Sequence, residues 1–265
     1  MSGVPCWQVD AFTNRPFGGN PAAVCWLDQP ADPEWMQSVA MEMNLSETAF
    51  VRPLGADYEL RWFTPTVEVD LCGHATLATA HALWSSGTVS ASGPLRFQTR
   101  SGLLTCERNG DWLELNFPAL PAVAAEPAPG VLAALGISTP CFVGRNQFDH
   151  LVVLDSPAAV LAVRPDFRQL GAVPTRGVIV TARDDSQPYD FVSRFFAPAV
   201  GVDEDPVCGS AHCCLAPYWA AQLGKRDLLA HQVSRRGGVL RLRTEGDRVV
   251  LGGQAVTVWS GQFAR

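Results

Sequence analysis

The sequence has little of what marks nucleic-acid-binding, membrane-bound or secreted proteins. Its 20 Lys and Arg residues are outnumbered by 26 Asp and Glu residues, which gives a formal net charge of −6. No stretch is rich in Lys and Arg beyond short pairs such as Arg235-Arg236, so binding to nucleic acid or to an anionic membrane is not expected. No uncharged apolar run reaches the roughly 20 residues of a membrane-spanning helix, and no signal peptide precedes the first strand pattern. These absences predict a cytoplasmic protein.

The sequence also lacks the common metal and nucleotide motifs. It has 8 cysteines but no Cys-x-x-Cys pair, so we expect reduced thiols and no metal site. The Gly-rich loop at residues 16–21 has no Lys-Ser/Thr after it, and no Gly-x-Gly-x-x-Gly opens a helix. Nucleotide cofactors are therefore not expected, and no other cofactor is indicated.

An internal repeat is the most informative feature that is present. Residues 61–70, RWFTPTVEVD, and residues 194–203, RFFAPAVGVD, share six positions at an offset of 194 − 61 = 133. After three additional residues in the second copy, at or near 204–206, CGHA at residues 72–75 matches CGSA at residues 208–211. Two matches in the same order indicate one ancestral unit used twice.

Each copy of the repeat predicts a strand, a turn and then a buried helix. Aromatic and β-branched residues before each turn favour a strand. Residues 75–84 and 211–221 are small or apolar almost all round, which is typical of a helix buried on every side. Residues 32–43 predict a further helix, with Asp32 as its cap. Most of the remaining pattern predicts strands, namely residues 6–12, 22–27, 49–51, 95–99, 103–107, 113–117, 150–154, 177–181, 239–244, 249–251 and 256–259.

The predicted fold class is therefore α+β, with two similar halves that each wrap a β-barrel-like sheet around a central helix. The Pro- and Ala-rich segment 118–129 is the natural linker. We expect an N-terminal half of residues 1–117 plus 258–265 and a C-terminal half of residues 118–257.

The chemistry is expected at the two repeated turns. Free backbone N–H groups at a helix N-terminus attract anions, and Gly73 and Gly209 would let a ligand approach the backbone closely. If the halves face each other, the two turns would hold a carboxylate-bearing substrate between them.

Side chains at the turns add candidate functional groups. His74 can donate, accept or carry a proton, although it could also cap its own helix. Ser210 is a hydrogen-bond donor at the equivalent position, or a plain N-terminal cap. Asp205 could orient His74 or bind substrate, although an Asp before Pro206 also suits an ordinary turn.

A second candidate lies in the segment NLSE at residues 44–47. Glu47 stands beside apolar residues, where desolvation would raise its pKa towards neutrality, as a general acid/base requires. A solvated Glu at a strand edge is the simpler alternative.

The chain resembles the PhzF-like, phenazine-biosynthesis-type isomerase family of the diaminopimelate-epimerase superfamily. The resemblance rests on four stretches that span both halves: VDAFTNRPFGGNPAAV (9–24), MNLSETAFV (43–51), RWFTPTVEVDLCGHATLA (61–78) and SRFFAPAVGVDEDPVCGSA (193–211).

The resemblance implies a two-half diaminopimelate-epimerase-like fold, a homodimer and no cofactor. It places the acid/base role on Glu47 and further catalytic roles on His74 and Asp205. It places substrate binding on Gly209 and Ser210, and we add Ser46 and Gly73 from the same motifs. The implied reaction is an acid/base proton shift on a small unsaturated or cyclic carboxylic or amino acid.

Two alternatives remain open. The related epimerases and proline racemases use one catalytic Cys at each turn, and this chain has Cys72 and Cys208 there. Helix N-termini would lower the pKa of both thiols, so a two-cysteine racemase is feasible. Against it, Cys-Gly is followed by His74 and not by Asn. The second alternative is a small-acid-binding protein that has lost catalysis.

Overall fold

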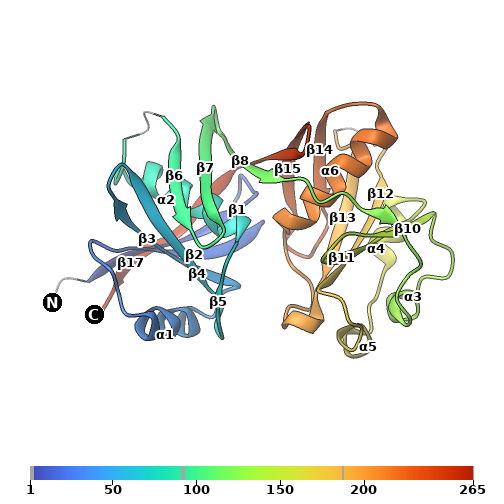
Figure 1. Ribbon diagram of the computed structural model, residues 1–265, viewed down its shortest axis with the longest axis horizontal. Coiled ribbons are helices and arrows are strands. Elements are labelled where there is room, and N and C mark those ends of the chain that lie inside the picture. Colours follow the sequence, from blue (N-terminus) through green and yellow to red (C-terminus); the bar gives the residue numbers. More distant parts are fainter. Residues whose placement is uncertain (1–2, 91–92, 187, 265) are drawn as a thin grey trace. The chain divides into compact units, whose positions relative to one another are not determined.

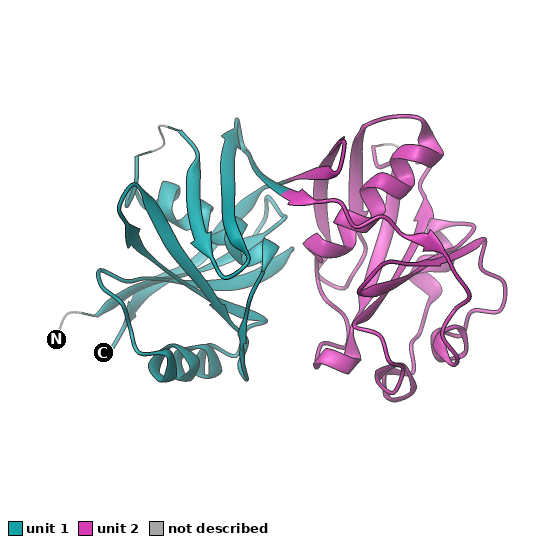
Figure 2. Ribbon diagram, in the orientation of Figure 1, with its two compact units in different colours: residues 1–116, 252–265 teal, residues 117–251 magenta. Residues whose placement is uncertain are grey.

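The computed structural model describes residues 3–90, 93–186 and 188–264, and the chain divides into two compact units (Figures 1 and 2). Unit 1 comprises Met1–Asn116 and Gly252–Arg265, and unit 2 comprises Phe117–Leu251. The division predicted from sequence placed the return to the first half at residue 258. Unit 1 resumes at Gly252, 258 − 252 = 6 residues earlier. None of the described helices is long and apolar enough to cross a membrane.

The described residues of unit 1 form a mixed sheet and two helices. The second helix packs against strands β1, β2, β3, β7 and β17, and its side chains are buried on almost every side, as the sequence predicted. The elements are β1 (Val4–Ala11), β2 (Asn20–Trp26), α1 (Pro33–Met43), β3 (Glu47–Leu54), β4 (Asp57–Phe63), β5 (Glu68–Val69), α2 (Gly73–Ser85), β6 (Leu95–Thr99), β7 (Gly102–Asn109), β8 (Trp112–Pro118) and β17 (Ala255–Phe263).

Unit 2 repeats this plan with more short helices. Its long helix packs against β14 and β15. The elements are β9 (Val123–Ala124), α3 (Val131–Leu135), β10 (Phe142–Arg145), β11 (Asp149–Val153), α4 (Pro157–Ala162), α5 (Phe167–Gly171), β12 (Gly177–Arg183), β13 (Phe191–Phe196), the 3₁₀ turn η1 (Pro198–Val200), α6 (Gly209–Leu223), β14 (Asp227–Gln232), β15 (Gly238–Glu245) and β16 (Arg248–Gly253).

The strand pairing shows the repeat at the level of topology. In unit 1, β2 pairs parallel with β3, β3 antiparallel with β4, β4 parallel with β6, and β6 antiparallel with β7. In unit 2, β11 pairs parallel with β12, β12 antiparallel with β13, β13 parallel with β14, and β14 antiparallel with β15. In both units the buried helix follows the third of these strands.

Ion pairs at equivalent positions reinforce the repeat. Arg61 holds Glu68 through two hydrogen bonds of 2.7 and 2.8 Å, and Arg194 holds Glu204 through two of 2.7 and 3.0 Å. The two glutamates are offset by 204 − 68 = 136 residues, so the additional residues of the second copy precede Glu204. Each pair braces the loop that leads into a buried helix.

Some local predictions from sequence are confirmed, and some elements were missed. Asp32 caps α1 by accepting a hydrogen bond from the backbone of Glu34 at 3.0 Å. The short helices α3, α4 and α5 and the strands β10 and β14 were not predicted. Helices of five or six residues carry too few turns to show a helical period.

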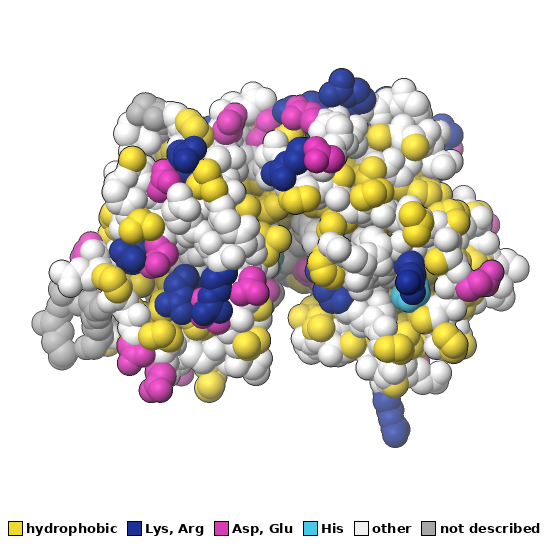
Figure 3. Space-filling model, in the orientation of Figure 1, with side chains coloured by type: hydrophobic (Ala, Val, Ile, Leu, Met, Phe, Trp, Pro, Cys, Tyr) yellow, Lys and Arg dark blue, Asp and Glu magenta, His cyan; other side chains and the backbone are white. Residues whose placement is uncertain are grey.

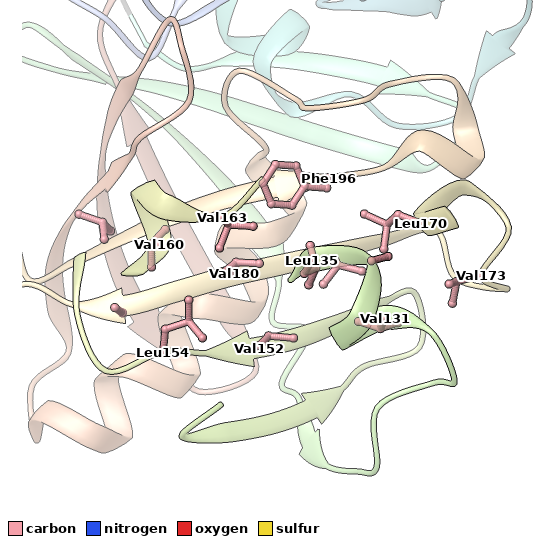
Figure 4. Close-up of a cluster of buried hydrophobic side chains, with 14 residues drawn as sticks. Val131, Leu135, Val152, Leu154, Val160, Val163, Leu170, Val173, Val180 and Phe196 are labelled. Carbon is pink, nitrogen blue, oxygen red and sulfur yellow. The ribbon is translucent and has the colours of Figure 1, made fainter. Parts of the chain in front are cut away.

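The three short helices cover a sheet face in unit 2 and form its hydrophobic core with β11, β12 and β13 (Figure 4). Val180 of β12 lies inside this cluster and has no exposed surface. Residues of this kind account for most of the burial that stabilises a unit of this size.

We predict that Val180→Ala lowers the free energy of unfolding by roughly 1–3 kcal/mol, because the lost methyl groups leave a cavity that the core fills only in part. The matched control is Val200→Ala, since Val200 is 60% exposed. Urea unfolding monitored by circular dichroism checks this. Equal destabilisation by the two variants would contradict the proposed packing.

Candidate functional site

The predicted acid/base pair meets at the N-terminal end of α2 in unit 1. Glu47 is the first residue of β3, and His74 lies in the first turn of α2. Glu47 Oε2 and His74 Nε2 are 3.1 Å apart, with 19% and 8% of the two side chains exposed. Residues 27 positions apart in the sequence are thus brought into direct contact in a shielded place.

Two further groups fix the opposite edge of the imidazole. The side-chain nitrogen of Asn20 lies 3.3 Å from His74 Nδ1 and donates to it, so neutral His74 carries its proton on Nε2, facing Glu47. Ser46 Oγ in turn donates to Asn20 Oδ1 at 3.4 Å. The Cys72 sulfur lies 3.6 Å from Nδ1 and can accept its N–H when the ring is protonated.

The side chains around His74 change its pKa. Burial disfavours the cation, but the Cys72 sulfur and the Glu47 carboxylate outweigh it, and the pKa of His74 is raised well above its ordinary value. A raised folded-state pKa stabilises the fold at pH values below the unfolded value, and this stabilisation is lost as pH rises through the folded-state value. The carboxylate of Glu47 and the ring of His74 lie at ion-pair distance, with 3.1 Å between Oε2 and Nε2.

The two turn cysteines are held as thiols. Burial, followed by the charge of Glu47, raises the pKa of Cys72. Burial, followed by the charge of Asp205, raises the pKa of Cys208 well above its ordinary value. The expectation that the helix N-termini would lower both values is therefore wrong, since desolvation of the thiolate dominates.

The second turn forms a separate cluster within unit 2. Gly209 begins α6 and Ser210 follows it; the Ser210 hydroxyl lies 3.3 Å from the Cys208 sulfur. Asp205 Oδ1 accepts a hydrogen bond from the Val207 backbone at 3.3 Å, which is a local turn contact of the kind expected before a proline.

The first turns of the two long helices are also braced alike. Thr76 Oγ1 donates to the Cys72 carbonyl at 2.6 Å, and the ring nitrogen Nδ1 of His212 lies 2.8 Å from the Cys208 carbonyl. Thr76 and His212 are equivalent at an offset of 212 − 76 = 136. Unit 1 places an imidazole, a thiol and a carboxylate at its turn, whereas unit 2 places a hydroxyl, a thiol and a carboxylate there.

A metal site is not required to explain these groups. Glu47, Cys72 and His74 are the candidate ligand group found among the described residues, with one ligand atom from each lying within 4.8 Å of the others. However, Glu47 approaches Nε2 and Cys72 approaches Nδ1, and one metal ion cannot occupy both edges of the same ring. The arrangement fits a proton-transfer group better.

Comparison with known proteins gives the family. Residues 9–261 match the family described as phenazine biosynthesis-like protein, PhzC-PhzF. The chain belongs to this family.

Relatives of the chain extend over its full length. An uncharacterized isomerase of Halalkalibacterium halodurans is 54% identical over 97% of both chains. A crystal structure of a PhzF family protein from Enterococcus faecalis has a TM-score of 0.95, with 42% identity and 100% coverage of both chains. The family resemblance and the enzyme class inferred from the sequence agree with these names.

More distant structures bear on the fold alone. A probable proline racemase from Agrobacterium radiobacter is 13% identical, with a TM-score of 0.64 over 98% of this chain and 93% of that one. The α+β, diaminopimelate-epimerase-like fold predicted from sequence is thereby confirmed.

Three polar residues of the PhzC-PhzF chain were missed by sequence reasoning. Asn20, fully buried beside His74, ends the Gly-rich stretch at residues 16–20 and is the first residue of β2. Asp149 and Arg176 join the second turn through Ser210, but neither stands in a motif. The packing of the strands brings them there, so sequence spacing alone gives no signal for them.

We predict that Glu47→Gln lowers the pKa of His74, because the neutral amide no longer favours the imidazolium while burial still opposes it. Titration of the His74 ring signals by NMR, assigned with His74→Asn, measures the shift. Glu42→Gln is the control, since Glu42 is an exposed glutamate of α1. An unchanged His74 titration in Glu47→Gln would show that the carboxylate does not govern it.

Proposed function

We propose that this protein is a cofactor-independent isomerase that moves a proton on a small unsaturated or cyclic carboxylic or amino acid. The contact between Glu47 and His74 carries the proposal, because it gives a shielded carboxylate a partner that can accept or return its proton. The isomerase names of relatives more than half identical support the same reaction class.

We assign each residue a role from its place in the two turns. Glu47 removes a proton from substrate carbon and returns one at another position, while His74 holds or relays charge beside it. Gly73, Gly209 and Ser210 bind the substrate through hydroxyl and backbone N–H donors at the two helix N-termini. Ser46, immediately before β3, adds a hydroxyl. Asp205 orients the substrate from unit 2. We also propose a homodimer located in the cytoplasm.

We predict that Glu47→Gln slows hydrogen exchange at the substrate carbon by at least about 100-fold, the usual contribution of a positioned acid/base group. The assay incubates a panel of small unsaturated acids and amino acids in D2O and reads deuterium uptake by mass spectrometry. Glu42→Gln should exchange at the wild-type rate. Full exchange activity in Glu47→Gln would refute the assignment, and no exchange with any acid would favour the binding-protein alternative.

A second candidate is a racemase in which Cys72 and Cys208 act as the two bases. The occurrence of cysteine at both turns supports it. The raised thiol pKa values count against it, because the thiolate is the reactive form.

We predict that Cys208→Thr retains deuterium exchange within about threefold, since threonine keeps a small side chain at the buried position without a thiol. A two-cysteine racemase would instead lose exchange at the α-carbon of its amino acid by orders of magnitude in this variant. Chiral chromatography of the amino acids in the same panel distinguishes the two, and loss of racemisation would favour the cysteine mechanism.

A further inference from the structure

An ion pair in unit 2 connects the sheet to the second turn. Asp149 begins β11 and stands in register with Gly177, the first residue of β12. Arg176, immediately before β12, donates from Nε and Nη2 to the two carboxylate oxygens of Asp149, the Nε bond being 2.8 Å long. The Asp149 side chain has no exposed surface, whereas 34% of the Arg176 side chain is exposed. The pair therefore has a buried acidic end and an open basic end.

Asp149 binds one edge of the Arg176 guanidinium, and two aromatic rings lie near the guanidinium group. Its central carbon lies 5.0 Å from the ring centroid of Phe148 and 5.8 Å from that of Phe195. A guanidinium flanked by aromatic rings and held by a two-pronged carboxylate has lost most of its rotational freedom. It pays little further entropy when its remaining N–H groups bind a ligand.

The remaining donors of Arg176 lie on the side of the second turn. Nη2 donates to Ser210 Oγ at 2.9 Å. Nη1 has no hydrogen-bond partner among the residues that the structure describes. Its two N–H groups are thus free to bind a ligand next to Ser210.

The Arg176 bond also sets the direction of the Ser210 hydroxyl. Because Ser210 Oγ accepts from Arg176, its own hydrogen points elsewhere, either to the Cys208 sulfur at 3.3 Å or to a ligand. A positive donor and a hydroxyl donor held side by side match the two oxygens of a carboxylate.

We propose that Arg176, which no sequence motif assigns, binds a ligand carboxylate together with Ser210. The proposal rests on the proposed function, since it names the group that holds the acid substrate at the second turn. A purely structural role, in which Arg176 only neutralises the buried Asp149, is the alternative that the experiment must exclude.

The experiment measures binding of benzoate, with benzamide as its uncharged counterpart, by titration monitored with protein NMR. The wild-type protein should bind benzoate and should bind benzamide at least about tenfold more weakly, the usual gain from a charge-assisted hydrogen bond. Arg176→Lys keeps the positive charge but loses the fork of donors, so benzoate affinity should fall by at least about tenfold.

Two further variants separate binding from stability. The double variant Asp149→Asn with Arg176→Gln removes both charges, leaves neither buried alone, and should also lose benzoate binding. Arg183→Lys is the matched control, because Arg183 lies at the other end of β12 and pairs with the exposed Asp185. It should bind benzoate as the wild type does.

The outcomes are decisive in both directions. Wild-type benzoate affinity in Arg176→Lys or in the double variant would overturn the proposal, as would equal binding of benzoate and benzamide or no benzoate binding by the wild-type protein. Glu47→Gln should bind benzoate normally. Loss of deuterium exchange with retained binding in that variant therefore tests the proposed isomerase separately from the carboxylate site.

Discussion

His74 lies between a carboxylate on one edge of its ring and an amide and a thiol on the other, all screened from solvent. The rest of the proposed chemistry depends on this arrangement. A buried histidine would ordinarily be neutral, because a cation is costly to desolvate. The neighbouring Cys72 and Glu47 side chains outweigh that cost, and the pKa of His74 is raised well above its ordinary value. Strand β3 positions Glu47 and helix α2 positions His74.

The two units share a scaffold but differ in the chemistry that it presents. The ion pairs Arg61–Glu68 and Arg194–Glu204 brace the same loop in each, and a side chain one turn into each long helix bonds the carbonyl of its turn cysteine. The side chains beside the turns have diverged. Unit 1 places Glu47 and His74 beside its turn, whereas unit 2 places Ser210 and Arg176 there.

Much of the fold could be predicted because the same sequence pattern occurs in both units, where it forms the same elements. The aromatic strand, the Pro-containing loop and the all-apolar helix recur in order, and α1 carries its cap at Asp32. The candidate acid/base residues followed from the NLSE and CGHA stretches. By contrast, Asn20 and the Asp149–Arg176 pair act through contacts between strands far apart in the chain. The raised thiol pKa values were missed for a related reason, since the burial of a turn is not visible in its sequence.

The pairing of β1 with β17 joins residues near the two ends of the chain, with register from Val4 opposite Phe263 to Ala11 opposite Ala255. Unit 2 is thus inserted within unit 1. During synthesis on the ribosome, unit 2 is complete before the strand that closes unit 1 has emerged. Unit 1, which carries Glu47 and His74, can therefore complete its sheet only after the whole of unit 2 has been synthesised.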